Sequence, residues 1–341
     1  MDDPYVGAPL SRDTTSHEFR LLELQPSELL GPIRCALRTY SFDSDPPAYT
    51  ALSYTWGSMA NPNVIELNGI SFTVGHNLWS FLKEMRFQQQ YHVYWIDAIC
   101  IDQRNILERN HQVQLMRQIY SNANAVSIWL GSIDQFPYVK WGMEFLATGK
   151  SARSCTKNQA RGIAELCSRD YWSRVWIIQE IMLGRNCTIH YCNLSVDIRR
   201  LVTLFGELRS SPTARLPREL LDSPAAIVVL AKFARSGAPN SISLMQLLER
   251  YRHQKATNIL DKVYALHGLA PDSSAMIIDY GISAEELAVK LLHFAYLKID
   301  LRVDIVERRR LLMNFGEMVA KMLNVEWSRE DVRFKITVMD D

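Results

Sequence analysis

Apolar and polar residues alternate in the amino-terminal part of the chain in the way that β-strands require. VIELNGISFTV (64–74) predicts a β-hairpin, because Asn68 and Gly69 supply the two positive-φ positions of a type I′ turn. Asn77 is then expected to cap a short helix. Three further runs read as strands: FRLLEL (19–24), IRCALRTYSF (33–42) and AYTALSYTWGS (48–58). This part of the chain is therefore expected to be mostly strand.

The run VYWIDAICIDQRNILERNHQVQLM (93–116) begins like a strand, expected over 93–99, and continues as a helix. Its apolar residues are those of a strand covered on both faces, where an ionised carboxylate is costly unless it is paired. Asp97 and Asp102 are therefore expected where the strand ends. Apolar spacings of three and four over 108–120 predict an amphipathic helix, and AVSIWL (125–130) predicts the next strand.

Strand, helix and strand in this order form a βαβ unit, whose strands are expected to be parallel and joined by a right-handed crossover. Ligands of such sheets bind beyond the carboxyl ends of the strands. Asp97, Asp102 and the Trp56-Gly57 turn would all lie at that edge. The sequence thus predicts a group of rim residues on an α/β sheet.

A long helix is expected from about residue 158 to 183, with Gly184 as its carboxyl cap. Within that helix Ser173, Trp176 and Glu180 follow one another at spacings of three and four, so they would share one stripe.

The remainder of the chain is expected to be mostly helical after a strand at NCTIHYC (186–192). The final segment, 308–341, has the pattern of a helix followed by a strand. The expected organisation is a flexible leader (1–18), an α/β domain (19–195) and a helical region packed on it (196–341).

Composition narrows the class of protein. The chain has 341 residues, of which 48% are hydrophobic and 22% charged, as in an ordinary globular protein. Its formal net charge of +1 gives no general basic field, so no nucleic-acid partner is expected, and the arginines at 308–310 are interpreted as a solvated surface. No apolar run approaches the ~20 residues of a membrane span. Sparse cysteines and a polar amino terminus favour a cytoplasmic protein.

Several blocks, in order, resemble the fungal heterokaryon incompatibility (HET) domain family. They are YTALSYTWG (49–57), YWIDAICIDQ (94–103), ERNHQVQLMRQIY (108–120), AVSIWLG (125–131) and YWSRVWIIQE (171–180). DKVYALHGLA (261–270) and IIDYGISAEELA (277–288) look like segments that often follow the domain. The resemblance covers roughly residues 19–300. It implies a cytosolic regulator of cell death after fusion of unlike fungal cells, working in immune-type signalling.

A more remote similarity is to Toll/interleukin-receptor (TIR) domains, several of which cleave NAD with a glutamate on a helix. It implies a TIR-like, partly parallel sheet, NAD as candidate substrate and Glu180 as catalytic carboxylate. Cleavage of the nicotinamide–ribose bond passes through an oxocarbenium-like transition state, which a carboxylate near the ribose stabilises. The nucleotide would then be bound by residues from Ser53, Tyr54, Trp56, Gly57, Asp97, Asp102, Ser173 and Trp176.

Each candidate also has a structural interpretation. Glu180 could pair with Arg174 or Arg185 at a helix end, or be solvated. One of Asp97 and Asp102 is expected to contact ligand, and the other to cap the following helix or pair with a neighbouring arginine.

Aromatic residues at strand ends, such as Tyr54 and Trp56, either stack a ligand ring or belong to the core. Gly57 is better explained by its turn than by phosphate binding, because no Gly-rich phosphate-binding loop occurs.

Cys187, His190 and Cys192 do not have the spacing of a usual zinc site, and no metal is expected. Two hypotheses of different classes remain for the whole chain. One is NAD glycohydrolysis by Glu180. The other is a signalling module without turnover that assembles with itself or with an incompatibility partner protein.

Overall fold

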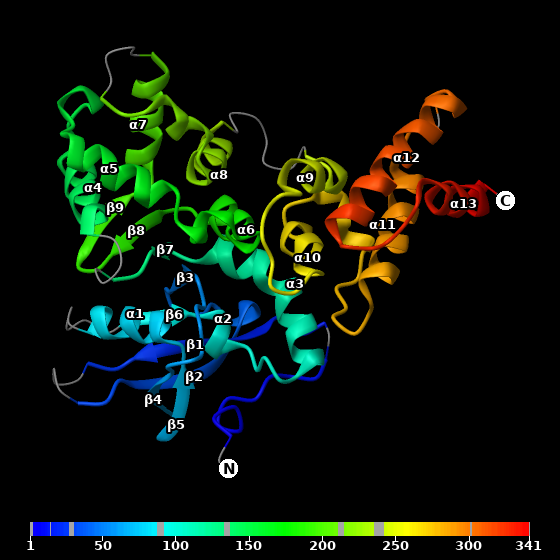
Figure 1. Cartoon of the computed structure of the whole chain (residues 1–341). Coiled ribbons are helices and arrows are strands. Elements are labelled where there is room, and N and C mark those ends of the chain that lie inside the picture. Colours follow the sequence, from blue (N-terminus) through cyan, green and yellow to red (C-terminus); the bar gives the residue numbers. More distant parts are fainter. Residues whose placement is uncertain are drawn as a thin grey trace. The chain divides into compact units, whose positions relative to one another are not determined.

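The computed structural model describes residues 3–13, 15–26, 31–86, 92–132, 137–210, 215–234, 242–300 and 302–340. The chain divides into two compact units (Figure 1). The first comprises Met1–Ser173 and Glu180–Gly237, and the second comprises Arg174–Gln179 and Ala238–Asp341. Helix α6 (Trp176–Leu183) therefore contributes residues to both units.

One sheet organises the first unit. Its strands among the described residues are β1 (Glu18–Leu24), β2 (Arg34–Ser41), β3 (Thr50–Tyr54), β4 (Asn63–Leu67), β5 (Ile70–Val74), β6 (His92–Trp95), β7 (Ala125–Trp129), β8 (Cys187–Tyr191) and β9 (Leu194–Asp197). They lie in the order β5-β4-β2-β1-β6-β3-β7-β8-β9. The neighbours β6, β3, β7 and β8 are mutually parallel, and β9 closes that end by pairing antiparallel with β8. The predicted α/β class is confirmed.

The predicted hairpin is confirmed in detail. β4 and β5 pair antiparallel with Leu67 opposite Ile70, which leaves Asn68 and Gly69 as a two-residue turn. Both have positive φ, 51° and 77°, as this kind of turn requires. Asn68 also fixes the turn to its neighbour strand, because its side-chain oxygen accepts from the Leu37 amide at 2.9 Å.

The two strands of the predicted βαβ unit, β6 and β7, are parallel as expected, but β3 lies between them and pairs with both. β3 is the central parallel strand, and its residues from Ala51 to Tyr54 are all buried. A strand that is covered on both faces can occupy this place although its sequence alternates. The helix α3 (Ile106–Asn122) connects β6 to β7 with a crossover that skips one strand.

The strand expected over 93–99 was too long. β6 ends at Trp95, and Asp97 opens a short helix, α2 (Asp97–Cys100). The amide of Cys100 donates to the Ile96 carbonyl at 2.7 Å, which closes the helical turn. Ile99 and Cys100 are fully buried. The sequence stays apolar beyond the end of the strand because the helical turn that follows is also in the core.

The long helix expected over 158–183 is also wrong, because the chain breaks into α5 (Lys157–Cys167), the 3-10 turn η4 (Asp170–Ser173) and α6. The indole of Trp172 is buried and donates to the Leu166 carbonyl at 2.8 Å, which turns the chain back on α5. Ser173 therefore does not share a helical stripe with Trp176 and Glu180.

Helices α4 (Pro137–Thr148), α5, α7 (Arg199–Ser210) and α8 (Pro224–Phe233) complete the first unit. In Figure 1, α4, α5 and α7 gather near β8 and β9. The boundary predicted after residue 195 falls inside this unit, since α7 and α8 come after it.

The second unit is helical. Its helices are α9 (Leu244–Tyr251), α10 (Asp261–His267), α11 (Ala284–Lys298), α12 (Ile305–Met322) and α13 (Arg329–Asp340). The strand expected near the end of the chain is wrong, because α13 takes its place. Val332 and Ile336 favour strands by composition, but they are four residues apart and both buried, so they form the inner face of a helix.

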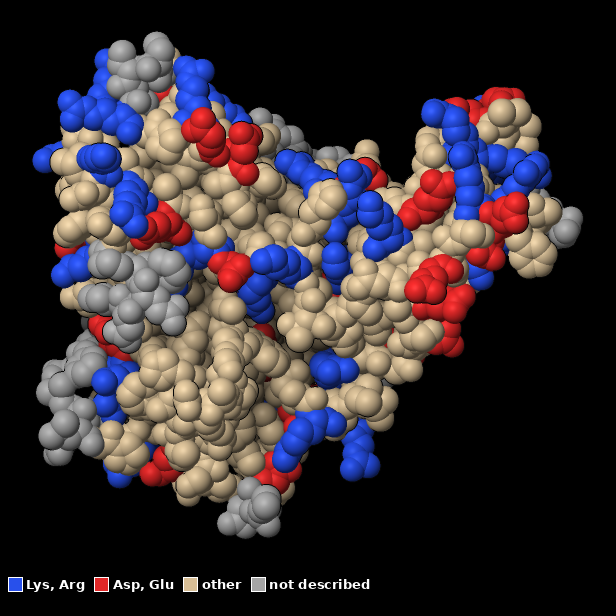
Figure 2. All heavy atoms as spheres, viewed as in Figure 1, with Lys and Arg blue, Asp and Glu red and all other residues tan. Residues whose placement is uncertain are grey.

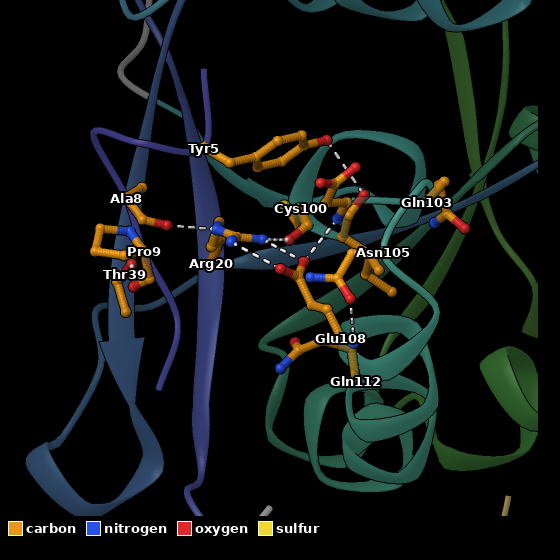
Figure 3. A network of polar contacts seen from close by, with 12 residues as sticks. Tyr5, Ala8, Pro9, Arg20, Thr39, Cys100, Gln103, Asn105, Glu108 and Gln112 are labelled. Atoms are coloured by element: carbon orange, nitrogen blue, oxygen red, sulfur yellow. Dashed lines mark hydrogen bonds and ion pairs between the residues drawn. The ribbon is translucent and has the colours of Figure 1, made fainter. Parts of the chain in front are cut away.

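The described part of the expected leader lies on the first unit. Tyr5 is buried, and its hydroxyl donates to the Ile101 carbonyl at 3.2 Å (Figure 3). The Pro9 carbonyl accepts from the Thr39 hydroxyl at 2.9 Å. Residues 3–9 thus contact the segment that follows α2. Met1, Asp2 and Thr14 lie outside the described residues.

Candidate functional site

The carboxyl ends of the parallel strands define the candidate site. Because β6, β3 and β7 are parallel neighbours, the residues that follow them meet at one edge of the sheet. These are Asp97 after β6, Trp56 after β3 and Gly131 after β7. The Trp56 indole donates to Asp97 Oδ2 at 2.8 Å. Two residues predicted for the rim are therefore brought together.

Asp97 and Asp102 have different environments. Asp97 Oδ1 accepts from the Ala98 amide at 2.8 Å, and its carbonyl accepts from the Gln103 side chain at 2.9 Å. Asp102 accepts from both the amide and the Nε of Arg104, at 3.1 and 3.0 Å. Asp102 therefore shapes the turn that leads into α3, whereas Asp97 stays at the rim beside Trp56.

Asn77 holds the rim from the side of α1 (His76–Arg86). Its Nδ2 donates to the Thr55 carbonyl at 2.6 Å, and its Oδ1 accepts from the Trp129 indole at 2.9 Å. It is the second residue of α1 and not the cap that the sequence suggested. One amide group thus connects the end of β3 with the end of β7.

Arg169 reaches the same edge from the connection between α5 and η4. A Cβ placed on Gly131 would lie 3.4 Å from Arg169 Nη2 and 3.6 Å from Asn77 Oδ1. Gly131 has φ of 97°, which side chains of other residues rarely allow. Burial lowers the pKa of the Arg169 guanidinium. A cation is therefore held close to bare backbone at the end of β7.

Glu180 lies beneath this edge in a buried group of oxygen atoms. Its side chain is 3% exposed, and Oε2 accepts a hydrogen bond from Ser53 Oγ of β3. The Tyr171 hydroxyl of η4 is 2.5 Å from the same Oγ. A carboxylate withdrawn from water must be compensated by such contacts. The structure thus joins the predicted residues Ser53 and Glu180 and adds Tyr171, which the sequence did not indicate.

The other predicted site residues have local roles. Tyr54 is buried in β3, and Gly57 takes φ of 74° in the turn after it. The Ser173 hydroxyl donates to the Asp170 carbonyl of its own turn at 2.7 Å. Trp176 is the first residue of α6 and is partly exposed.

Cys187 and His190 lie in β8, and Cys192 follows the strand directly. Within the described ranges no group of three His, Cys, Asp or Glu side chains could hold a metal ion. Burial lowers the pKa of His190 to about 4. Its Nε2 lies 3.4 Å from the Ser127 hydroxyl, so this imidazole is a neutral core group at physiological pH.

Acidic and basic side chains are interspersed on the face shown in Figure 2. In the arginine triplet, Arg310 pairs with Glu307 at 2.6 Å and Arg308 donates to the Tyr296 carbonyl at 3.0 Å. In the part of the chain that the structure describes, no helix combines the length and apolarity needed to cross a bilayer.

The blocks at 261–270 and 277–288 contact each other in the second unit. The Tyr264 hydroxyl donates to the Asp279 carbonyl at 2.8 Å, and the Tyr280 hydroxyl donates to Asp261 Oδ1 at 2.7 Å. The two tyrosine rings are in edge contact, with centroids 5.1 Å apart. DKVYALHGLA and IIDYGISAEELA therefore form one packed element.

Comparison with known proteins agrees with these blocks. A family model described as "Heterokaryon incompatibility protein (HET)" matches residues 49–180. "Heterokaryon incompatibility protein 6, OR allele" of Neurospora crassa is 27% identical over an alignment of 359 residues, which covers 82% of this chain and 51% of the relative. The chain thus spans about half the length of that protein. No solved structure matches significantly.

The matched region contains every predicted site residue, from Ser53 to Glu180, and runs from the start of β3 through α3 and β7 to α6. The order of the blocks and the related sequence agree. Residues 49–180 are therefore similar to the HET domain, and the chain as a whole is similar to a heterokaryon incompatibility protein.

Proposed function

We propose that this chain acts in the cytoplasm in heterokaryon incompatibility, as a signalling protein that promotes cell death, and that it does so by hydrolysing NAD to nicotinamide and ADP-ribose. The biological part of the proposal rests on the match to the HET family model and on the similarity to the Neurospora heterokaryon incompatibility protein. The chemical part rests on the site at the carboxyl edge of the sheet.

One observation carries the chemical part: a buried carboxylate, Glu180, is hydrogen-bonded to Ser53 near the end of the central parallel strand. Ser53 precedes Trp56 by three residues, which corresponds to about 10 Å or less along the chain. The rim at Trp56 and Asp97 and the carboxylate beneath it are therefore within the length of one nucleotide. The Ser53 hydroxyl already donates to Glu180, and ribose hydroxyls have the same chemistry.

In the proposed reaction the bond between C1′ of the ribose and N1 of nicotinamide breaks. Nicotinamide leaves with the bonding electron pair as a neutral molecule, so no acid has to protonate it. The Glu180 carboxylate stabilises the positive charge that develops on the ribose. Water then adds to C1′ and releases a proton, giving ADP-ribose. Trp56 would stack on a ring of the nucleotide, and Asp97 would accept from ribose hydroxyls.

The proposal is tested by nicotinamide release from NAD with wild type and Glu180→Gln, at low and at high protein concentration. Glutamine keeps the size of the side chain but removes its charge, so we expect release to fall at least about a hundredfold. Glu144→Gln, a carboxylate on α4 that is 46% exposed, is the matched control and should keep full activity. Circular dichroism verifies that the variants are folded.

Absence of nicotinamide release at every concentration, together with no shift of the melting temperature by NAD, would refute the enzymatic proposal. Equal release by wild type and Glu180→Gln would assign the chemistry to another group.

A second candidate function, assembly without turnover, is favoured by apolar side chains on the surface of the second unit. Leu297 on α11 is 65% exposed, and Phe334 and Val338 on α13 are 70% and 58% exposed. Phe334 and Val338 are four residues apart and so lie on one face of the helix. Exposed apolar groups on one face are typical of a contact surface.

If these residues form a self-association surface, Phe334→Glu should shift the protein toward monomer in sedimentation velocity experiments. Burying a charge in an apolar contact without a partner costs several kcal/mol, so the shift should be large. Val306→Glu, at a residue of α12 that is 73% exposed, is the control and should leave the sedimentation unchanged. Wild type that is monomeric at all accessible concentrations would exclude this role.

A further inference from the structure

No sequence pattern indicated Arg169 as a functional group, and two observations define its position. Its Nη2 is 3.4 Å from where a Cβ of Gly131 would be, so the guanidinium lies beside the backbone at the end of β7. Asn77, which links the ends of β3 and β7, borders the same point at 3.6 Å. The Arg169 guanidinium thus lies at the carboxyl edge of the parallel strands.

The charge of Arg169 is partly withdrawn from water. Burial lowers its pKa, while Tyr191, Cys192, Asp170 and Glu165 act in the opposite direction. Its Cζ is 5.6 Å from the centre of the Tyr191 ring, which forms an apolar wall beside it. Glu165 also accepts from Arg161 at 2.9 Å, so its charge is shared between two arginines. A guanidinium in such a setting binds an anion more strongly than an exposed one does.

The spacing of the strands relates Arg169 to the rest of the rim. Adjacent strands lie about 4.8 Å apart, so Gly131 after β7 is about one strand from Trp56 and about two strands, roughly 10 Å, from Asp97. A nucleoside diphosphate has comparable distances between its phosphates, its ribose hydroxyls and its base. An anion at Arg169 would therefore leave the sugar near Asp97 and a ring near Trp56.

We propose that Arg169 binds the diphosphate of a nucleotide laid across the carboxyl edge of β6, β3 and β7, with Gly131 allowing the phosphates to approach the backbone closely. The planar guanidinium presents paired N–H donors that match phosphate oxygens. This inference rests on the proposed function, because the nucleotide it calls for is NAD or its product ADP-ribose.

The test measures binding, not turnover, with the full chain and ADP-ribose as the probe in isothermal titration calorimetry. Arg169→Gln should weaken ADP-ribose binding at least about tenfold, the effect of one charge-assisted contact. Arg169→Lys should retain part of the affinity, because it keeps the charge without the paired donors. The matched control is Arg199→Gln, which removes an arginine that is 62% exposed at the start of α7 and should change little.

Two further measurements use other probes. Inorganic pyrophosphate should compete with ADP-ribose, and the affinity for adenosine, which has no phosphate, should be the same in wild type and Arg169→Gln. Failure of pyrophosphate to compete, no ADP-ribose binding by wild type, or equal losses in Arg169→Gln and Arg199→Gln would each overturn the proposal.

The outcomes also separate this proposal from the hydrolase. Arg169-dependent binding of ADP-ribose without nicotinamide release would keep the diphosphate site and reject the hydrolysis. Glu180-dependent nicotinamide release with unchanged ADP-ribose binding in Arg169→Gln would keep the hydrolysis and reject the diphosphate site.

Discussion

Replacing Arg20 by alanine should lower the free energy of unfolding by about 3–5 kcal/mol, because it breaks a buried ion pair and leaves one charge uncompensated. Arg20 is 2% exposed, and its guanidinium donates to both oxygens of Glu108, at 2.6 and 3.1 Å (Figure 3). It also donates to the carbonyls of Ala8 at 2.6 Å and Cys100 at 3.1 Å. The arginine therefore joins β1, the amino-terminal segment, α2 and α3.

The measurement is urea unfolding followed by circular dichroism at neutral pH. Arg38→Ala is the control, since Arg38 pairs with Glu23 at 2.8 Å but its side chain is 63% exposed, and it should cost less than about 1 kcal/mol. The double variant Arg20→Met/Glu108→Leu should be more stable than Arg20→Ala, because it leaves no buried charge. A loss in Arg20→Ala no larger than in Arg38→Ala would mean that water already solvates the pair.

The second large effect is expected from Gly162→Ala in α5. A Cβ on Gly162 would overlap the carbonyl oxygen of Tyr138 in α4 and lie 2.8 Å from the amide nitrogen of Gly142. The backbones of the two helices touch here, so the helices must separate to admit one methyl group. Overpacking of this kind costs about 1–3 kcal/mol and occasionally more, and a contact with rigid backbone favours the upper end.

Gly206→Ala provides the matched control, because no atom lies within 4 Å of the position its Cβ would take in α7. There the same substitution should stabilise the protein by about 0.5–1 kcal/mol through helix propensity alone. Opposite signs for the two variants in thermal or urea unfolding are the expected result. A stabilising Gly162→Ala would contradict the close packing of α4 on α5.

Local chemistry made parts of the fold predictable. Asn68-Gly69 required a tight turn wherever the hairpin lay, and the apolar run at 125–130 had few alternatives to a buried strand. The break between α5 and α6 had no such signal. It depends on the Trp172 indole finding the Leu166 carbonyl, a contact that the periodicity of the segment does not contain. α13 was misread because β-branched residues spaced four apart satisfy either pattern.

The same division applies to the site. Trp56 and Asp97 could be placed together because parallel strands end at one edge, a rule that acts through topology. Arg169, Asn77 and Tyr171 could not be placed, because the direction of each side chain depends on elements distant in sequence. Arg169 in addition fell inside the expected helix, where its side chain would have been assigned to solvent.

The central position of β3 affects whether the segment matched by the HET family model can fold by itself. Within residues 49–180 the sheet would consist of β6, β3 and β7 without the β4–β5 hairpin, because β1, β2 and β8 lie outside the matched region and β4 joins the sheet through β2. In the whole chain β1 covers the free side of β6 and β8 covers that of β7. An isolated 49–180 fragment would present both sides as unpaired backbone, each a template for another strand. The segment that the family model matches thus lacks the strands that cover β6 and β7, and its ability to fold alone depends on those flanking strands.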